Sequence, residues 1–166
     1  NELFQLIEYK HLTAKVHERP FLFIPPCINK FYILDLQPEN SFVRYAISQG
    51  QRTFVVSWRN ADASLAKKTW DDYVEDGVIE AISVVQQISG AEQINALGFC
   101  VGGTILSNAL AVLAARDREP VASATFLTTL INFDDTGILD LFIDEASVKY
   151  REMEMGQGGL MKGKDL

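Results

Sequence analysis

The chain has 166 residues, of which 48% are hydrophobic and 22% are charged, so it is long enough for one globular domain with a buried core. Its formal net charge of −7 at pH 7 argues against a nucleic-acid-binding surface, and we expect no nucleic-acid partner. The apolar stretches are of strand length or are interrupted by polar residues, so we expect neither a signal peptide nor a transmembrane segment.

Strand and helix patterns alternate along most of the chain. The first residues, 1–15, fit either an edge strand or a short helix. Continuous apolar runs then predict four buried strands, over residues 20–24, 52–58, 93–99 and 121–131. Helical periodicity and capping residues predict helices over residues 41–49, from 64 or 69 to 89, 101–116 and 138–153. This alternation predicts an α/β fold with a mostly parallel sheet flanked by helices.

The strongest candidate site lies in residues 93–116, QINALGFCVGGTILSNALAVLAAR. A strand, a turn and a helix surround Cys100, which has the G-x-S-x-G spacing of a nucleophile elbow with Cys in place of Ser. A Cβ at Gly98 or Gly102 would clash as the turn tightens, and Cys100 must take a strained backbone conformation. The amide of Val101, at the helix N-terminus, can stabilise an oxyanion. A small buried cysteine between glycines is the plainer interpretation, but the strand–turn–helix context favours the elbow.

Loops at the carboxyl ends of parallel strands meet at one edge of the sheet, which predicts where the rest of a site would lie. The amide of Ile28, or that of Cys27, is the candidate for a second oxyanion donor, because the loop after this strand supplies one in α/β-hydrolases. The cysteine side chain at 27 is interpreted as a small loop residue. The segments expected at this edge are residues 27–29, 58–60, 100 and 132–135.

A cysteine nucleophile needs a base, and the sequence offers poor candidates. The two histidines, His11 and His17, precede the first clear strand and do not fit the chain order nucleophile, acid, histidine. Asp134 and Asp135 follow the strand after the elbow, where one is expected to cap the next helix and the other to be solvated. Within these residues the triad is incomplete. The two cysteines lack metal-ligand spacing, so we expect no metal site and a reducing cytoplasm.

Several separate stretches carry a resemblance that covers nearly the whole chain: PPCINKFYILDLQPENSFVRYAISQG, FVVSWRNADAS, TWDDYVEDGVIEAI, INALGFCVGGTILSNALAVLAAR and FLTTLINFDDTGILDLFIDE. They resemble the catalytic domain of polyhydroxyalkanoate synthases, also called poly(3-hydroxybutyrate) polymerases. The G-F-C-V-G-G form around Cys100 is most similar to the class I enzymes.

The resemblance implies that Cys100 is the acyl-carrying nucleophile and that the amides of Val101 and Ile28 form the oxyanion hole. It implies an α/β-hydrolase-like sheet truncated before its last strands, with residues 1–133 as the N-terminal part of the core and residues 134–166 as the incomplete start of a cap, or lid. The family's catalytic Asp and His would lie beyond residue 166, and its N-terminal domain would be absent. The chain starts with Asn1 rather than Met, and we expect a fragment that is inactive alone.

The same resemblance implies polymerisation of 3-hydroxyacyl-CoA, with 3-hydroxybutyryl-CoA as the expected substrate, and release of CoA. It implies no cofactor, a homodimer in the full-length protein, and a cytoplasmic enzyme at the surface of polymer granules. Two alternatives stay open. One is a cysteine-nucleophile hydrolase resembling dienelactone hydrolase, which has a similar elbow. The other is a non-catalytic interaction fragment that binds a second synthase chain or a granule protein.

Overall fold

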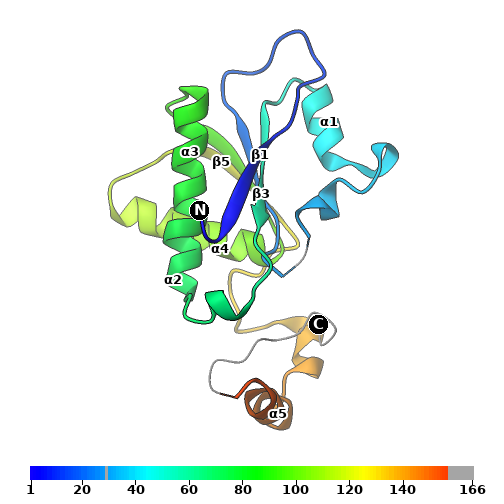
Figure 1. Ribbon diagram of the computed structural model, residues 1–166, viewed down its shortest axis with the longest axis vertical. Helices are drawn as coiled ribbons and strands as arrows, with labels where there is room; N and C mark the ends of the chain where they lie inside the picture. The colour runs from blue at the N-terminus through cyan, green and yellow to red at the C-terminus, as the bar shows by residue number, and fades with distance from the viewer. Residues whose placement is uncertain (29, 157–166) are drawn as a thin grey trace.

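The computed structural model describes residues 1–28 and 30–156, and a five-stranded sheet lies at its centre (Figure 1). The strand order is β1-β3-β2-β4-β5. Buried apolar residues dominate the three central strands, as expected for strands covered on both faces. The strands are β1 (Phe4–Glu8), β2 (Phe21–Ile24), β3 (Thr53–Trp58), β4 (Ile94–Phe99) and β5 (Val121–Leu127).

The sheet is parallel except at one edge. β2 pairs in parallel with β3 on one side and with β4 on the other, and β4 pairs in parallel with β5. β1 is an antiparallel edge strand, which decides the question that the sequence left open at residues 1–15. The fourth predicted strand ends at Leu127 rather than at residue 131, because Thr128 has a φ of 45° and turns the chain away from β4.

Helices cover both faces of the sheet (Figure 1). Helix α1 (Phe42–Ser48) packs on one face through Val43 and Ala46. Helices α3 (Glu80–Ser89) and α4 (Val101–Ala115) pack on the other face, in the larger core cluster. Together with the sheet they form the three layers of an α/β fold, so the predicted class is confirmed.

The capping residues explain where the first two helical regions begin. Ser41 accepts a hydrogen bond from the amide of Arg44 and starts α1. Thr69 and Asp72 form a capping box at the start of the second region. The sequence predicted one regular helix there, but the structure has α2 (Trp70–Asp72), a π-helical segment η4 (Tyr73–Ile79) and then α3.

The apolar face predicted for this helix is buried through most of its length but not at its ends. The side chains of Trp70 and Ile88 are 44% and 50% exposed. A π-helical segment has more residues per turn than an α-helix, so it rotates the residues before it about the helix axis relative to those after it. A face predicted with a constant period of 3.6 residues therefore does not stay on the buried side over the whole region. Gly90, with a φ of 74°, ends α3 as predicted.

Residues 137–155 differ from the single amphipathic helix predicted for 138–153. They form a 3-10 helix, η5 (Gly137–Phe142), and a separate helix, α5 (Glu145–Met155). Asp144 separates the two because its carboxylate accepts a hydrogen bond from the amide of Ser147 and starts a new helix. α5 has no buried residue, so it has no core-facing side in the structure. The last part of the predicted cap, residues 157–166, lies outside the described residues.

No helix in the described ranges is both long enough and apolar enough to span a bilayer.

Candidate active site

The strand order places a site between β2 and β4. From β2 the chain moves to β3 on one side, and it then returns past β2 to form β4 on the other. In such sheets ligands bind at the carboxyl ends of the strands where the order reverses. Ile24 of β2 is paired in register with Gly98 of β4, so the loop after Ile24 and the turn at Cys100 leave neighbouring strands at the same edge. These are two of the loops that the sequence singled out.

Cys100 has the strained backbone that a nucleophile elbow requires. Its φ is 53° and its ψ is −127°, a conformation that costs a side-chain-bearing residue about 1–3 kcal/mol. Its amide donates to the carbonyl oxygen of Leu127 over 2.9 Å, and its own carbonyl accepts from the amide of Gly103 over 2.9 Å. Both bonds hold Cys100 in place between β4 and α4. The predicted backbone strain is confirmed.

Three glycines let the elbow pack against its neighbours. A Cβ on Gly98 would lie 2.3 Å from the Cα of Gly103, so the strand could not approach its own helix. A Cβ on Gly102 would lie 2.2 Å from the carbonyl oxygen of Ile24, and one on Gly103 would lie 2.1 Å from Oγ1 of Thr129. The clashes predicted at Gly98 and Gly102 are confirmed. The third, at Gly103, comes from the loop after β5 and was not predicted.

One candidate oxyanion amide lies at the start of α4, and the other lies in the loop after β2. Val101 is the first residue of α4, where backbone N–H groups have no acceptor within the helix and carry partial positive charge. Ile28 lies in the loop after β2, and its side chain is 54% exposed. The structure brings the two segments to the same edge of the sheet. Their roles as donors stay predictions.

Cys27 lies close enough to Cys100 for Cys100 to affect its thiol. Burial raises the pKa of the Cys27 thiol, and the nearby Cys100 raises it further. Burial likewise raises the pKa of Tyr73, and Cys27 adds to this effect. A thiol with a raised pKa stays protonated at neutral pH and is a poor nucleophile. This agrees with the interpretation of Cys27 as a loop residue beside the site.

Trp58 contributes a contact to this edge that the sequence did not predict. Its indole N–H donates a 2.7 Å hydrogen bond to the carbonyl oxygen of Pro25, and both groups are buried. The buried indole packs in the core, as strand-end aromatic residues usually do, and its hydrogen bond carries no signal in the sequence. The next residues are engaged with neighbours: Arg59 pairs with Asp62, and Asn60 accepts a hydrogen bond from Lys30.

The histidines lie near the amino end of β3, on the opposite side of the sheet from the carboxyl ends of the strands. The amide of His17 donates to the carbonyl oxygen of Gly50, and its ring nitrogen lies 3.1 Å from the carbonyl oxygen of Gln49, just before β3 begins. His11 is next to Leu12, whose amide contacts the end of α1. Both positions are at the amino end of β3, whereas Cys100 is at the carboxyl edge. The expectation that neither histidine belongs to the site agrees with this placement.

Asp134 and Asp135 organise the loop that follows β5. The carboxylate of Asp134 accepts a hydrogen bond from the side chain of Asn132, and that of Asp135 accepts from the amide of Gly137 at the start of η5. The residue that precedes η5 is Thr136, and no side chain caps this 3-10 helix, so the expected capping role of one of these aspartates is wrong. Asp135 stabilises a local turn instead. Within the described ranges, no group of three His, Cys, Asp or Glu side chains is arranged to hold a metal ion.

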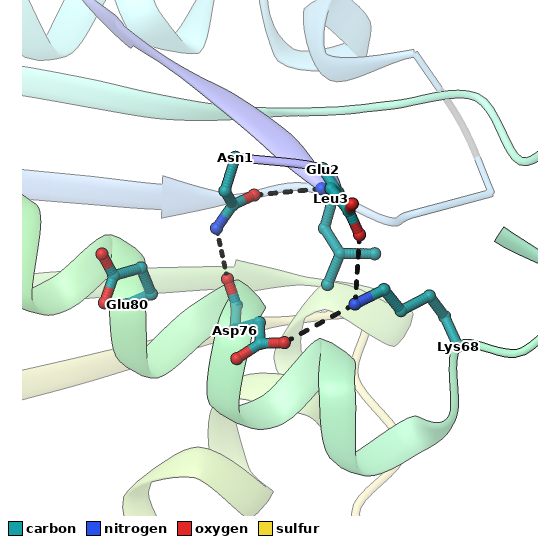
Figure 2. A pocket seen from close by; sticks show the side chains of 6 residues that line it. All are labelled: Asn1, Glu2, Leu3, Lys68, Asp76 and Glu80. Carbon is teal, nitrogen blue, oxygen red and sulfur yellow. Dashed lines mark hydrogen bonds and ion pairs between the residues drawn. The ribbon is translucent and has the colours of Figure 1, made fainter. Parts of the chain in front are cut away.

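A separate surface pocket lies where β1 meets the second helical region (Figure 2). Its charged groups are largely paired with one another. The ammonium of Lys68 lies 3.4 Å from a carboxylate oxygen of Glu2 and 3.7 Å from one of Asp76, and the side chain of Asn1 donates to the carbonyl oxygen of Asp76. Because the Lys68 ammonium is held by carboxylates, we assign no chemistry to this pocket.

Comparison of the sequence with known proteins identifies the family of this chain. The chain is 60% identical over its whole length to the poly(3-hydroxyalkanoate) polymerase subunit PhaC of Cupriavidus necator and 41% identical over 98% of its length to that of Rhizobium meliloti. The chain belongs to the poly(3-hydroxyalkanoate) polymerase family. It spans 29% and 27% of the lengths of these two polymerases.

The match to the polymerases reaches the first strands of the sheet. Residues 1–46 match the family described as the poly-beta-hydroxybutyrate polymerase (PhaC) N-terminus. These residues form β1, β2 and most of α1. The matched residues supply β1 and β2 to the sheet, in agreement with their assignment to the core of residues 1–133. The absence of a separate N-terminal domain stays a prediction.

The fold has relatives of known structure. An α/β hydrolase from the metagenome of sediments of the Mar Chica lagoon in Morocco superimposes with a TM-score of 0.53. The match covers 96% of this chain and 61% of the hydrolase at 15% sequence identity, so it speaks for the fold alone. The predicted α/β-hydrolase-like architecture is confirmed.

Proposed function

We propose that this chain forms the nucleophile-bearing part of a polyhydroxyalkanoate polymerase active site. Cys100 takes the acyl group of a 3-hydroxyacyl-CoA, with 3-hydroxybutyryl-CoA as the expected substrate, and passes it into the growing polyester. One observation carries the proposal. In a chain 60% identical to a polymerase subunit, Cys100 has a φ of 53° at the carboxyl end of the central strand β4.

The chemistry suits a thiol nucleophile. The Cys100 sulfur attacks the thioester carbonyl, a new C–S bond forms, the C–S bond to CoA breaks, and CoA leaves as a thiolate that takes up a proton. One thioester replaces another of similar energy, so the acyl group stays activated. A 3-hydroxyl then attacks the acyl-enzyme and gives its proton to the base that we place in the rest of the polymerase. A C–O bond forms, the C–S bond to Cys100 breaks, and Cys100 leaves as a thiolate. A serine in its place would lower the acyl group to the energy of an ester at the first step.

Both steps pass through a tetrahedral oxyanion, for which we propose two donors. The amide of Val101 lies at the N-terminus of a 15-residue helix, where the helix dipole favours negative charge. The amide of Ile28 lies in the loop after β2, which is in direct contact with the first turn of α4 at Gly102. Losing one such donor typically costs about 10²–10³ in rate.

The remaining machinery is proposed to come from the rest of a full-length polymerase. We place the catalytic Asp and His C-terminal to residue 166, as the resemblance implies, since both histidines of this chain lie at the other edge of the sheet. The piece alone is then inactive. The acyl transfer uses the thiol and the CoA thioester, and we propose no cofactor and no metal ion.

Residues 131–153 are proposed to cover the site and to meet other molecules. Water must be kept from the acyl-enzyme, because hydrolysis would end the polymer chain. A contiguous exposed apolar segment is typical of an interaction surface. We propose that it contributes to a lid, to a homodimer contact and to binding at granule surfaces in the cytoplasm. The exposed apolar side chains are Ile131, Phe133, Ile138, Leu139, Leu141, Ile143, Val148 and Met153.

Two other functions are separated by the same assay. A cysteine-nucleophile hydrolase would release free 3-hydroxy acid without making polymer. A non-catalytic interaction piece would neither bind the acyl group covalently nor release CoA. The 60% identity to a polymerase subunit supports polymer synthesis over both.

The test is intact-mass analysis of a full-length polymerase that contains these residues, after exposure to 3-hydroxybutyryl-CoA, with the modified residue located by peptide digestion. We expect a 3-hydroxybutyryl adduct on Cys100 that grows by further units. Release of CoA without an adduct would support the hydrolase. Absence of both the adduct and CoA release, in a correctly folded protein, would refute catalysis by Cys100.

A further inference from the structure

One carbonyl group joins the two segments that carry the candidate oxyanion donors. The carbonyl oxygen of Pro25 accepts the 2.7 Å hydrogen bond from the indole N–H of Trp58. The first turn of α4 presses on the same group, because a Cβ on Gly102 would lie 2.6 Å from this oxygen. The end of β3, the loop after β2 and the helix that begins with Val101 therefore meet at Pro25.

The link from this carbonyl to Ile28 is short and stiff. Pro25 and Pro26 are both buried, and each proline ring fixes its φ near −65°. Only Cys27 separates the second proline from Ile28. A shift of the Pro25 carbonyl therefore also shifts the Ile28 amide, because few rotatable backbone angles lie between them.

The indole of Trp58 is itself held from several sides. A Cβ on Gly77, in the π-helical segment η4, would lie 3.0 Å from two carbons of the indole ring, so a side chain at residue 77 would displace the ring by a few tenths of an ångström. The rings of Tyr73 and Phe4 lie 5.6 Å and 6.1 Å away, centroid to centroid. With its ring fixed, the N–H has one direction in which to point, and the Pro25 carbonyl occupies it.

We propose that Trp58 is the positioning residue of the oxyanion loop: its indole N–H fixes the Pro25–Pro26 peptide and, through it, the Ile28 amide relative to the Val101 amide. Trp58 acts through the loop and does not touch the substrate. The proposal rests on the proposed function, in which both amides stabilise the oxyanion formed when Cys100 attacks the thioester.

This role predicts an effect on acyl transfer that loss of packing alone would not give. A displacement of about 1 Å in a catalytic group can cost about 100-fold in rate. Alkylation of Cys100 by iodoacetamide requires the thiolate but forms no oxyanion. Loss of the Trp58 N–H should therefore slow acylation of Cys100 and leave its alkylation unchanged, whereas general loosening of the site would change both.

The experiment uses a full-length polymerase carrying Trp58→Phe, which keeps an aromatic ring and removes the N–H. Tyr73→Phe is the matched control, because it removes a polar group from the neighbouring ring and leaves the Trp58–Pro25 hydrogen bond intact. Single-turnover acylation by 3-hydroxybutyryl-CoA, the alkylation rate, kcat and KM are measured for each. We expect Trp58→Phe to lower the acylation rate and kcat about 10- to 100-fold. The KM and the alkylation rate of Trp58→Phe should stay within about twofold of the wild type. For Tyr73→Phe, the acylation rate, the alkylation rate, kcat and KM should all stay within about twofold of the wild type.

The proposal is overturned if acylation by the Trp58→Phe protein is unchanged, or if acylation and alkylation fall together. If Trp58→Phe does not fold, 3-benzothienylalanine in place of Trp58 keeps the bicyclic shape without the N–H, and the same two rates decide. Failure of the proposed function would be visible earlier, as absence of acylation on Cys100 in the wild-type polymerase.

Discussion

Gly103 and Thr129 touch so closely that no side chain fits between them. A Cβ on Gly103 would lie 2.1 Å from Oγ1 of Thr129 and within 2.9 Å of two further carbons of the same side chain. Gly103 is in the first turn of α4, and Thr129 follows β5, the strand that pairs with β4. Because residue 103 has no side chain, the loop after β5 can pack directly on the start of α4.

Gly103→Ala is expected to destabilise the protein by about 1–3 kcal/mol, the usual cost of overpacking, although alanine is the better helix former. The three nearest atoms all belong to the Thr129 side chain, so Thr129→Gly should remove most of this cost. Thermal unfolding of the two single variants and the double variant, in a full-length polymerase, measures the coupling. Equal costs of Gly103→Ala in both backgrounds would contradict the contact.

Gly102→Ala is expected to be more damaging and to have no such partner. The atoms that its Cβ would meet are backbone atoms of Ile24 and Pro25, and no side-chain substitution can withdraw them. Either β2 or α4 must move, which separates Ile28 from Val101. We expect a large loss of acylation on Cys100 even in the fraction of protein that stays folded. Wild-type acylation by folded Gly102→Ala polymerase would show that the junction tolerates displacement.

Cys100 is expected to trade stability for function. Cys100→Gly relieves the strain of a φ of 53°, whereas Cys100→Ala retains it, so the glycine variant should be more stable than the alanine variant by about 1 kcal/mol. Both should lose acyl transfer completely. Thermal unfolding of the two inactive variants makes the comparison, and equal midpoints would show that the backbone at residue 100 is not strained.

Cys100→Ser is expected to leave at most weak polymer synthesis, because the intermediate becomes an ester and no longer drives ester formation. Turnover of 3-hydroxybutyryl-CoA by the full-length variant measures this. Near-wild-type turnover would refute the reasoning about the activated thioester.

Cys27 is expected to react slowly with alkylating reagents at neutral pH. Burial raises the pKa of its thiol, and the nearby Cys100 raises it further, so the thiolate becomes abundant only above the range of an ordinary cysteine. Iodoacetamide labelling from pH 7 to pH 10, mapped by peptide mass, follows Cys27, with the urea-unfolded protein as control. Cys100→Ala should shift the labelling profile of Cys27 to lower pH. Equal labelling of folded and unfolded protein at pH 7 would contradict the placement.

Asp62 makes the stability of its loop dependent on acid pH. Hydrogen bonds from the Ser64 side chain and from Arg59 lower its pKa to about 2 from the ordinary 3.8. A carboxylate with a lowered pKa stabilises the folded protein above about pH 4, and this stabilisation is lost as the pH falls from about 4 to about 2. Asp62→Asn should therefore lower the thermal midpoint at pH 6, and the difference from the wild type should shrink over that interval. A constant difference would rule out this titration.

The central part of the fold could be predicted from the sequence because its signals are local. The apolar run before Pro25 and the glycines around Cys100 identify β2, β4 and the elbow without knowledge of the partners. The same residues also predicted the strained backbone at Cys100. These predictions held because sheet burial and tight turns restrict which residue types can occur at each position.

What the sequence could not predict depends on contacts between distant segments. The hydrogen bond from Trp58 to Pro25 joins residues 33 positions apart, and a buried tryptophan at the end of a strand gives no sign of its acceptor. The π-helical segment η4 was missed because its sequence has an ordinary helical period; it accommodates the indole of Trp58 at Gly77. The break at Asp144 was missed because its capping role competes with an amphipathic pattern.

The hydrogen bond from the Cys100 amide to Leu127 has a consequence for the order of events during protein synthesis. Leu127, which accepts this hydrogen bond, is synthesised 27 residues after Cys100, and Thr129, which packs on Gly103, follows two residues later. At a synthesis rate of roughly 5–20 residues per second, the ribosome delivers these residues seconds later, and the exit tunnel delays their folding further. Until β5 pairs with β4, the Cys100 amide lacks this acceptor, and the strained backbone at residue 100 lacks this support. The turn at Cys100 is thus completed only after the strand on its far side has joined the sheet.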